Sequence, residues 1–314
     1  MTYVFGPVPS RRLGLSLGID LIPSKTCTYD CLYCQVGRTT YLTAEPEVFV
    51  PTGEVIGELK DTLEKFHPDT ITLAGSGEPT LHSEIDQVIS FLKGITDTRV
   101  ALLTNGSLLW RKTVRNRVLG ADLIMPTLTT VFEDTFRLIH RPHKELQLPI
   151  IIEGLKELRK DYEGAILLEV VLLAGINDNK KELEGMKKVI EEISPDKIQL
   201  NTVVRPPSDP RAMSLDMEQL EKIKNFFGEK AEIIAGISSN KKAGEFDPQF
   251  KAIIEMAKRR PITAADIAGV LDITLDESER ILKGFLLKGT IKKQEHEREV
   301  FYIAQDKVNE TSSE

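Results

Sequence analysis

The chain has 314 residues, of which 41% are hydrophobic and 28% are charged, and its formal net charge is −7. This length allows one large α/β domain and a small additional one, and the negative charge gives no general attraction to nucleic acid or to an anionic membrane. The chain has no uncharged apolar run of ~18 residues, so we expect no membrane span. Residues 1–12 lack the apolar core of a secretory signal.

From residue 15 to residue 234 the sequence alternates between two hydrophobic periods. Short apolar runs predict strands at 15–22, 70–74, 99–104, 121–125, 165–172 and 197–204, with a seventh at 231–234. Amphipathic segments predict helices at 53–66, 83–94, 108–119, 146–159, 179–193 and 215–227. Such alternation is typical of a parallel sheet with right-handed crossovers. It is compatible with a full (β/α)8 barrel, a partial barrel of about six units or an open doubly wound sheet.

Three unusual loops follow the first three predicted strands. Residues 27–34 hold all the cysteines, residues 75–80 read Gly-Ser-Gly-Glu-Pro-Thr, and Asn105-Gly106 ends the third strand. In a parallel barrel these loops lie together at the carboxyl ends of the strands, where active sites are built. The sequence therefore predicts a single site at this face.

Cys27, Cys31 and Cys34 are the only cysteines, and they lie within eight positions. Without a distant partner they argue against a disulfide framework and for a reducing compartment such as the cytoplasm. Three thiolates at this spacing can bind one soft metal centre. A [4Fe–4S] cube held by three ligands leaves one iron open for a small molecule. A structural zinc ion is the alternative, but it needs a fourth ligand, and the closest histidines, His67 and His82, are expected in other loops.

The spacing C-x3-C-x2-C, with Tyr33 before the last cysteine, resembles the cluster loop of the radical S-adenosylmethionine (SAM) superfamily. The resemblance implies a partial (β/α)6 TIM-like barrel and a [4Fe–4S] cluster on Cys27, Cys31 and Cys34. It implies that SAM binds the fourth iron and, after one-electron reduction by a ferredoxin or flavodoxin, yields methionine and a 5′-deoxyadenosyl radical that abstracts hydrogen. In this family the aromatic residue at the position of Tyr33 packs beside the adenine.

The loop from Gly75 to Thr80 supports the same resemblance. Small residues at Gly75, Ser76 and Gly77 allow close approach of backbone to a ligand, and Glu78 can accept a hydrogen bond from an ammonium group. In the superfamily a Gly-Gly-Glu loop at this place binds the SAM amino group, and here Ser76 replaces the middle glycine. A simple strand-to-helix turn is the alternative.

Later polar residues are candidates for the same cavity. Asn105 is expected either in a turn in which Asn and Gly adopt positive φ or against SAM, as in the superfamily. Three further residues lie on or just after later strands and are expected either in the cavity or at its rim: Glu169, Asn177 and Asn201.

Two further segments narrow the resemblance. The run from residue 5 to residue 37 and the segment 139–143 are similar to iron–sulfur oxidoreductases related to tRNA wyosine synthases, although this chain lacks the additional cysteines of the archaeal enzymes and the flavodoxin domain of the eukaryotic ones. The resemblance suggests an RNA base as substrate and leaves a peptide or small molecule open. Arg11 or Arg12 is expected to pair with a carboxylate or phosphate, or to lie in a solvated loop. For His140 and His143 a loop with its charges in solvent is favoured over proton donation or phosphate binding.

The C-terminal sequence predicts a second domain. Residues 1–238 are assigned to the barrel, 239–249 to a linker, 250–304 to a winged-helix-like domain and 305–314 to a disordered tail. The predicted helices of the winged-helix-like domain are 251–259, 263–269 and 276–288, followed by a hairpin of 290–293 and 300–303. Residues 251–314 carry 11 Lys/Arg and 12 Asp/Glu, and the third helix opens with acidic residues, so duplex DNA binding is unfavoured. Docking of an RNA or protein substrate is favoured, and a stabilising cap is the alternative.

A second class of function competes with the enzyme. An iron–sulfur redox sensor could bind nucleic acid through the winged helix and regulate transcription. A sensor needs neither a long βα body nor a glycine-containing loop beside the cluster, so the sequence favours the enzyme.

Overall fold

The computed structural model describes residues 2–10, 12–235, 249–271, 273–287, 289–297 and 299–305. Most of the chain folds around one eight-stranded sheet in the order β1-β2-β5-β6-β7-β8-β9-β10. The strands of this sheet are β1 (Val4–Ser10), β2 (Gly14–Ile19), β5 (Thr70–Leu73), β6 (Arg99–Thr104), β7 (Leu123–Pro126), β8 (Ala165–Leu172), β9 (Lys197–Thr202) and β10 (Ala231–Ile233). From β2 to β10 neighbouring strands are parallel, and β1 pairs antiparallel with β2. The predicted strands are confirmed, including the seventh.

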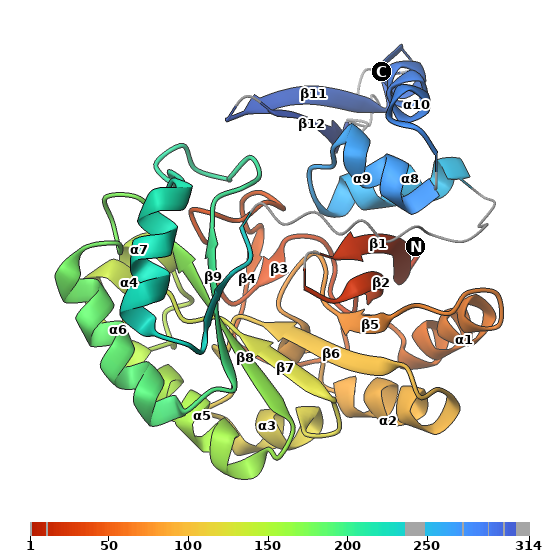
Figure 1. Ribbon diagram of the computed structural model, residues 1–314. Coiled ribbons are helices and arrows are strands. Elements are labelled where there is room, and N and C mark those ends of the chain that lie inside the picture. Colours follow the sequence, from red (N-terminus) through yellow and green to blue (C-terminus); the bar gives the residue numbers. More distant parts are fainter. Residues whose placement is uncertain are drawn as a thin grey trace, which may run out of the picture.

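Helices follow the strands and cover the outer side of the curved sheet (Figure 1). They are α1 (Thr52–Leu63), α2 (Ile85–Ile95), α3 (Lys112–Val118), α4 (Glu133–His140), α5 (Leu148–Asp161), α6 (Lys180–Ile193) and α7 (Met217–Phe227). A short 3-10 turn, η1 (Pro79–Leu81), and a two-residue parallel pair, β3 (Thr26–Cys27) and β4 (Tyr41–Leu42), lie in the loops. None of the helices in the described part of the chain is long and apolar enough to cross a membrane.

Strand alternation divides the core into two layers. In β6, Val100 and Leu102 pack against the helices in the main hydrophobic cluster, whereas Ala101 and Leu103 belong to a smaller inner cluster with Leu13. This is the period-two alternation that a sheet with two covered faces requires. The sheet order ends at β1 and at β10 rather than closing on itself, and Figure 1 shows the helices gathered on its outer side, so the fold is an open, partial barrel.

Among the strands of the large sheet and the helices that cover it, β1 and α4 were not predicted from the sequence. β1 contains two prolines, which cannot donate to a ladder, but it is the first strand in the sheet order and needs a ladder on one side only. α4 has only eight residues, and its polar first turn hides a buried face formed by Phe136, Ile139 and His140. The prediction that His140 lies in a solvent-exposed loop was therefore wrong.

The C-terminal part forms its own small hydrophobic cluster. It consists of α8 (Gln249–Arg259), α9 (Ala264–Leu271), α10 (Leu275–Leu287) and the antiparallel hairpin β11 (Ile291–His296) and β12 (Glu299–Ala304). We call the described residues 249–305 the C-terminal module. Thr263 begins α9 as expected, because its hydroxyl accepts from the Asp266 N–H while the Asp266 carboxylate accepts from the Thr263 N–H. In Figure 1 the module lies beside β1 and the N-terminus. The predicted linker up to residue 248, and the tail from residue 306, lie outside the described residues.

Candidate functional site

The cysteine loop lies after β2 and is fixed by backbone bonds to the end of α4. The Asp30 and Leu32 N–H groups donate to the carbonyls of His140 and Ile139, each at 2.8 Å. Leu32 is fully buried, and the Cys34 N–H donates to the Cys31 carbonyl at 3.2 Å. The loop is therefore rigidly placed, with Cys27, Cys31 and Cys34 all free of disulfides.

The electrostatics of the three thiols fit a metal cluster. Burial raises the pKa of each, that of Cys27 to about 12, and neighbouring thiol charge raises those of Cys27 and Cys31 further. Three thiolates could not coexist here without positive charge, which bound iron supplies. Among the described residues no three Cys, His, Asp or Glu side chains converge on a point that one ion could fill. Three thiolates within one loop are a donor set that fits a [4Fe–4S] cluster.

His140 contacts the cysteine loop directly. Its Nδ1 lies 3.1 Å from the Cys31 Sγ, and its Nε2 lies 2.5 Å from the Thr129 hydroxyl. Burial lowers the pKa of His140 to about 3, so the ring is neutral. A metal-bound thiolate can only accept, so Nδ1 then carries the proton and Nε2 accepts from Thr129. Tyr29 packs on the imidazole at 4.6 Å and Tyr33 at 5.8 Å between ring centroids.

The spacing of apolar residues before His140 indicates that it lies on the buried face of a helix. Phe132, Phe136 and Ile139 precede it at helical intervals, and this pattern places residue 140 on the buried face of α4. The next residue, Arg141, ends the helix in the left-handed conformation and pairs with Asp30 and Asp209.

The loop from Gly75 to Glu78 packs tightly against the cysteine loop. A Cβ on Gly77 would lie 1.8 Å from the Thr26 carbonyl oxygen, and a Cβ on Gly75 would lie 2.4 Å from the Asp20 carboxylate carbon. The Ser76 carbonyl accepts from the Lys25 N–H at 2.9 Å. The two glycines are therefore required by close approach, and the small residues that the sequence predicted as a ligand loop also hold two loops together.

Glu78 joins this loop to the end of β6. Its buried carboxylate accepts from the Thr80 N–H at 3.1 Å, the Thr80 hydroxyl at 2.5 Å, the Thr104 hydroxyl at 2.6 Å and the Asn105 N–H at 2.7 Å. Burial raises the pKa of Glu78, and these four donors oppose the rise. Three of the bonds fall on Oε1, so the acceptor capacity left for a ligand is on Oε2.

Asn105 points back to the cysteine loop. Its amide nitrogen donates to the Thr28 hydroxyl at 2.7 Å and lies 3.7 Å from the Cys27 Sγ. Its carbonyl accepts from the Ser107 N–H at 2.9 Å. In this turn the positive φ, of 74°, falls on Gly106 and not on Asn105.

A polar group on the inner face of the sheet lies near Tyr33. Burial and the charge of Cys31 raise the pKa of Tyr33, and the charge of Glu169 raises it further. Glu169 accepts from Asn201 at 2.9 Å and pairs with Arg12 at 3.2 Å. The expectation that an arginine of this segment pairs with a carboxylate is confirmed for Arg12.

The other predicted residues lie elsewhere. Asn177 is fully buried, and its amide bonds the backbone of Thr129, Val171 and Leu173, so its role is structural. His143 donates its backbone N–H to the Thr28 carbonyl, and its buried Nδ1 has no hydrogen-bond partner among the described residues. Arg11 lies outside the described residues.

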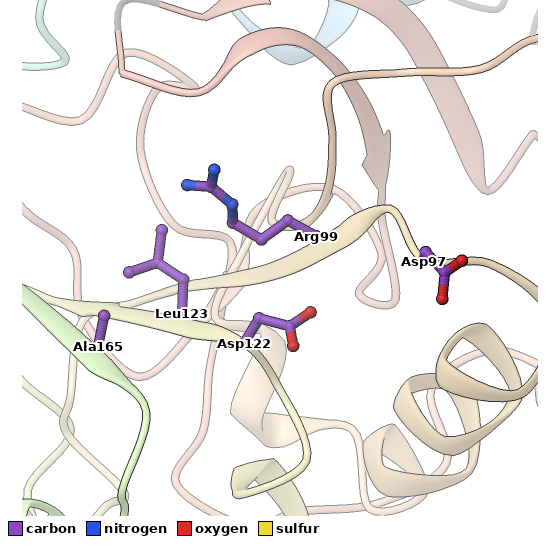
Figure 2. A pocket seen from close by; sticks show the side chains of 5 residues that line it. All are labelled: Asp97, Arg99, Asp122, Leu123 and Ala165. Atoms are coloured by element: carbon purple, nitrogen blue, oxygen red, sulfur yellow. The ribbon is translucent and has the colours of Figure 1, made fainter.

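A pocket of about 410 Å³ lies at the opposite end of the sheet, where β6, β7 and β8 begin (Figure 2). Asp122, which lines it, accepts from Lys93 and from the Val100 N–H. The Asp122 carboxylate is thus hydrogen-bonded within the fold, and the pocket lies away from the cysteine loop.

Three free cysteines in one loop, packed against a second, glycine-containing loop, are typical of an iron–sulfur protein that binds a small molecule. The family described as the Radical SAM superfamily matches residues 21–187, and the chain belongs to this superfamily. It is accordingly an enzyme that uses a [4Fe–4S] cluster and SAM.

Two relatives match nearly the whole chain. UPF0026 protein MJ1312 of Methanocaldococcus jannaschii is 34% identical over 96% of each chain. A protein of Brachyspira hyodysenteriae named GTPase Obg is 39% identical over 93% of this chain, which spans 43% of that protein. This chain has no Gly-x4-Gly-Lys-Ser/Thr phosphate-binding motif.

Solved structures share the fold. A radical SAM methyltransferase from Sphaerobacter thermophilus has a TM-score of 0.55 and 15% identity over 70% of this chain and 66% of that one. A structure of TYW1 with a lysine–pyruvate adduct bound has a TM-score of 0.51 and 16% identity over 72% of this chain and 76% of that one.

Proposed function

We propose that the chain holds the cluster on Cys27, Cys31 and Cys34 and binds SAM against the loop from Gly75 to Glu78. The observation that carries the proposal is the position of this loop, whose Gly77 touches the backbone of Thr26, next to the first cluster cysteine. A ligand on the open iron would thus lie within reach of both loops. When bound, the reduced cluster would supply one electron for the cleavage of SAM into methionine and a 5′-deoxyadenosyl radical, which would take a hydrogen atom from the substrate.

The chain's own residues hold and shield this chemistry. His140 and Asn105 present N–H groups to the thiolates of Cys31 and Cys27, and such bonds tune a cluster. Tyr33, whose ring lies against His140, would contact the adenine. Oε2 of Glu78 would accept from the SAM ammonium group. The apolar layers of the barrel would exclude water and stray hydrogen donors from the radical.

The electron would come from a ferredoxin or flavodoxin in the cytoplasm. Three free thiols are consistent with such a reducing compartment.

An RNA base is the substrate class that we favour. The resemblance to wyosine synthases supports it, although it is an argument by analogy. The three helices and hairpin of the C-terminal module are consistent with a winged helix, which would dock the RNA. Lys292 and Lys293 are exposed on the hairpin and would meet phosphates.

The first experiment tests SAM cleavage. The protein is reconstituted anaerobically with iron and sulfide, then given dithionite and SAM, and 5′-deoxyadenosine is measured. Wild type and Ser24→Ala, an exposed residue shortly before the loop, should form it, and Cys31→Ala should not. No product with wild type, or undiminished product with Cys31→Ala, would refute the proposal.

The second experiment tests the substrate class. RNA from a strain lacking the gene should stimulate 5′-deoxyadenosine formation and gain a modified nucleoside detectable by mass spectrometry. Ribonuclease treatment should abolish the stimulation. Stimulation that survives ribonuclease but is lost with protease would replace RNA by a peptide substrate.

A further inference from the structure

Arg259, the last residue of α8, joins the C-terminal module to the N-terminal strands. Its guanidinium donates to the Glu255 carbonyl and carboxylate, each at 2.9 Å, and to the Thr2 carbonyl at 2.8 Å. It also lies over the Phe5 ring at 4.6 Å. Its remaining nitrogen, Nε, lies 3.3 Å from Oδ2 of Asp20.

Asp20 carries this contact into the candidate SAM loop. It directly follows β2, and the side chains of both Asp20 and Arg259 are 9% exposed. The Asp20 carboxylate accepts from the Ser76 hydroxyl at 2.6 Å and from the Ser76 N–H at 3.1 Å. The missing side chain of Gly75 lets the carboxylate lie against the loop backbone.

We propose that Arg259 and Asp20 are positioning residues for the loop from Gly75 to Glu78, so that the C-terminal module forms part of the SAM site. The inference rests on the proposed function of that loop. It goes further because a residue 239 positions away from Asp20 then controls how well SAM binds.

Arg259 should affect the loop because an unpaired buried charge on Asp20 is costly. Burial raises the pKa of Asp20, and the Ser76 bonds and the Arg259 charge oppose this rise. Without the guanidinium the carboxylate would take up a proton or turn toward water. Either change alters the acceptor that fixes the Ser76 peptide, which lies between Gly75 and Gly77 in the loop proposed to bind SAM.

A second connection runs from the module to the cysteine loop. Arg205, after β9, pairs with Asp266 of α9 and donates to the Pro261 carbonyl. Three residues later, the Ser208 hydroxyl donates to the carbonyls of Cys31 at 2.8 Å and Leu32 at 3.0 Å. The module is thus attached to both loops of the site. The experiment must therefore separate a general destabilisation of the module from a specific effect of Arg259 on SAM binding.

The test measures the dissociation constant of SAM on the reconstituted, full-length protein, from the change that SAM causes in the electron paramagnetic resonance spectrum of the reduced cluster. Iron content and melting temperature are measured in parallel. Arg259→Met should weaken SAM binding about tenfold, which is a part of the cost of leaving a buried carboxylate unpaired. Lys258→Met removes the same charge from the same helix at an exposed position and should bind as wild type does.

Asp20→Asn carries the test if Arg259→Met does not fold. This variant is isosteric, leaves no unpaired carboxylate and should bind SAM several-fold more weakly with unchanged iron content. In Arg259→Lys, which keeps the charge, part of the affinity should return. If wild type binds SAM and Asp20→Asn binds it equally well, the inference is overturned while the proposed function stands. If wild type does not bind SAM at all, the proposed function fails first.

Discussion

Glu78→Gln tests how the candidate SAM loop is held to the end of β6. Two backbone N–H groups donate to the carboxylate, Thr80 to Oε1 and Asn105 to Oε2. A glutamine has one oxygen and one NH2 group. Whichever way the amide turns, one backbone N–H faces another donor, whereas the hydroxyls of Thr80 and Thr104 can rotate to accept.

The size of the effect follows from the burial of this group. Glu78 is 2% exposed. Losing a hydrogen bond to a charged acceptor costs about 1.5–3 kcal/mol, and the unsatisfied N–H adds about 1–3 kcal/mol. The neutral amide recovers part of this, because burial penalises the carboxylate and raises its pKa. We expect a net loss of about 2–3 kcal/mol in the free energy of unfolding, with a melting temperature lower by about 3–5 °C.

The assay is thermal and urea unfolding of the metal-free protein, followed by iron content after reconstitution. Iron retention should also fall, because the Asn105 backbone carries the amide that contacts Cys27. Glu184→Gln, on the exposed surface of α6 and paired with Lys180 at 3.7 Å, is the control and should change stability by less than about 0.5 kcal/mol. If Glu78→Gln is as stable as this control, the account of the loop is wrong.

Three further predictions concern the packing, the cluster and the C-terminal module. Gly77→Ala should abolish iron loading, because its Cβ would lie 1.8 Å from a carbonyl oxygen of the cysteine loop, whereas Gly57→Ala, with open space in α1, should raise the free energy of unfolding by about 1 kcal/mol. His140→Leu should make the cluster's reduction potential more negative, by about 40 mV for each 1 kcal/mol of lost N–H···S stabilisation, in a redox titration with SAM absent; an unchanged potential would contradict the contact at 3.1 Å. Burial raises the pKa of Asp266, but two neighbouring arginines lower it to about 2. The ionised carboxylate should therefore contribute about 2–3 kcal/mol to the free energy of unfolding above pH 4, and this contribution should be lost as the pH falls toward 2. In urea unfolding, the free energy of unfolding of wild type should fall between pH 5 and pH 3, and Asp266→Asn should lack this part of the decrease.

The sequence by itself determined the βα order and the ligand loops. Period-two runs and helical runs alternate because each strand and each helix must cover a hydrophobic face, and this constraint is local. The spacing of Cys27, Cys31 and Cys34 is local as well, so the cluster loop could be read directly. β1 and α4 were not predicted, because β1 contains prolines and α4 has a short, polar first turn. The segment at His140, which was expected to be a loop, is the end of a helix.

Only the tertiary structure decided which distant residues support these loops. His140 is 109 positions from the cysteine that it contacts, Arg12 reaches Glu169 across the inner face of the sheet, and Arg259 meets Asp20 from the other end of the chain. Each contact depends on where strand ends and helix ends meet in space, which residue spacing does not encode. The cysteine pattern predicts the cluster, and the folded chain supplies the N–H donors, the glycine contacts and the buried ion pair around the cysteine loop.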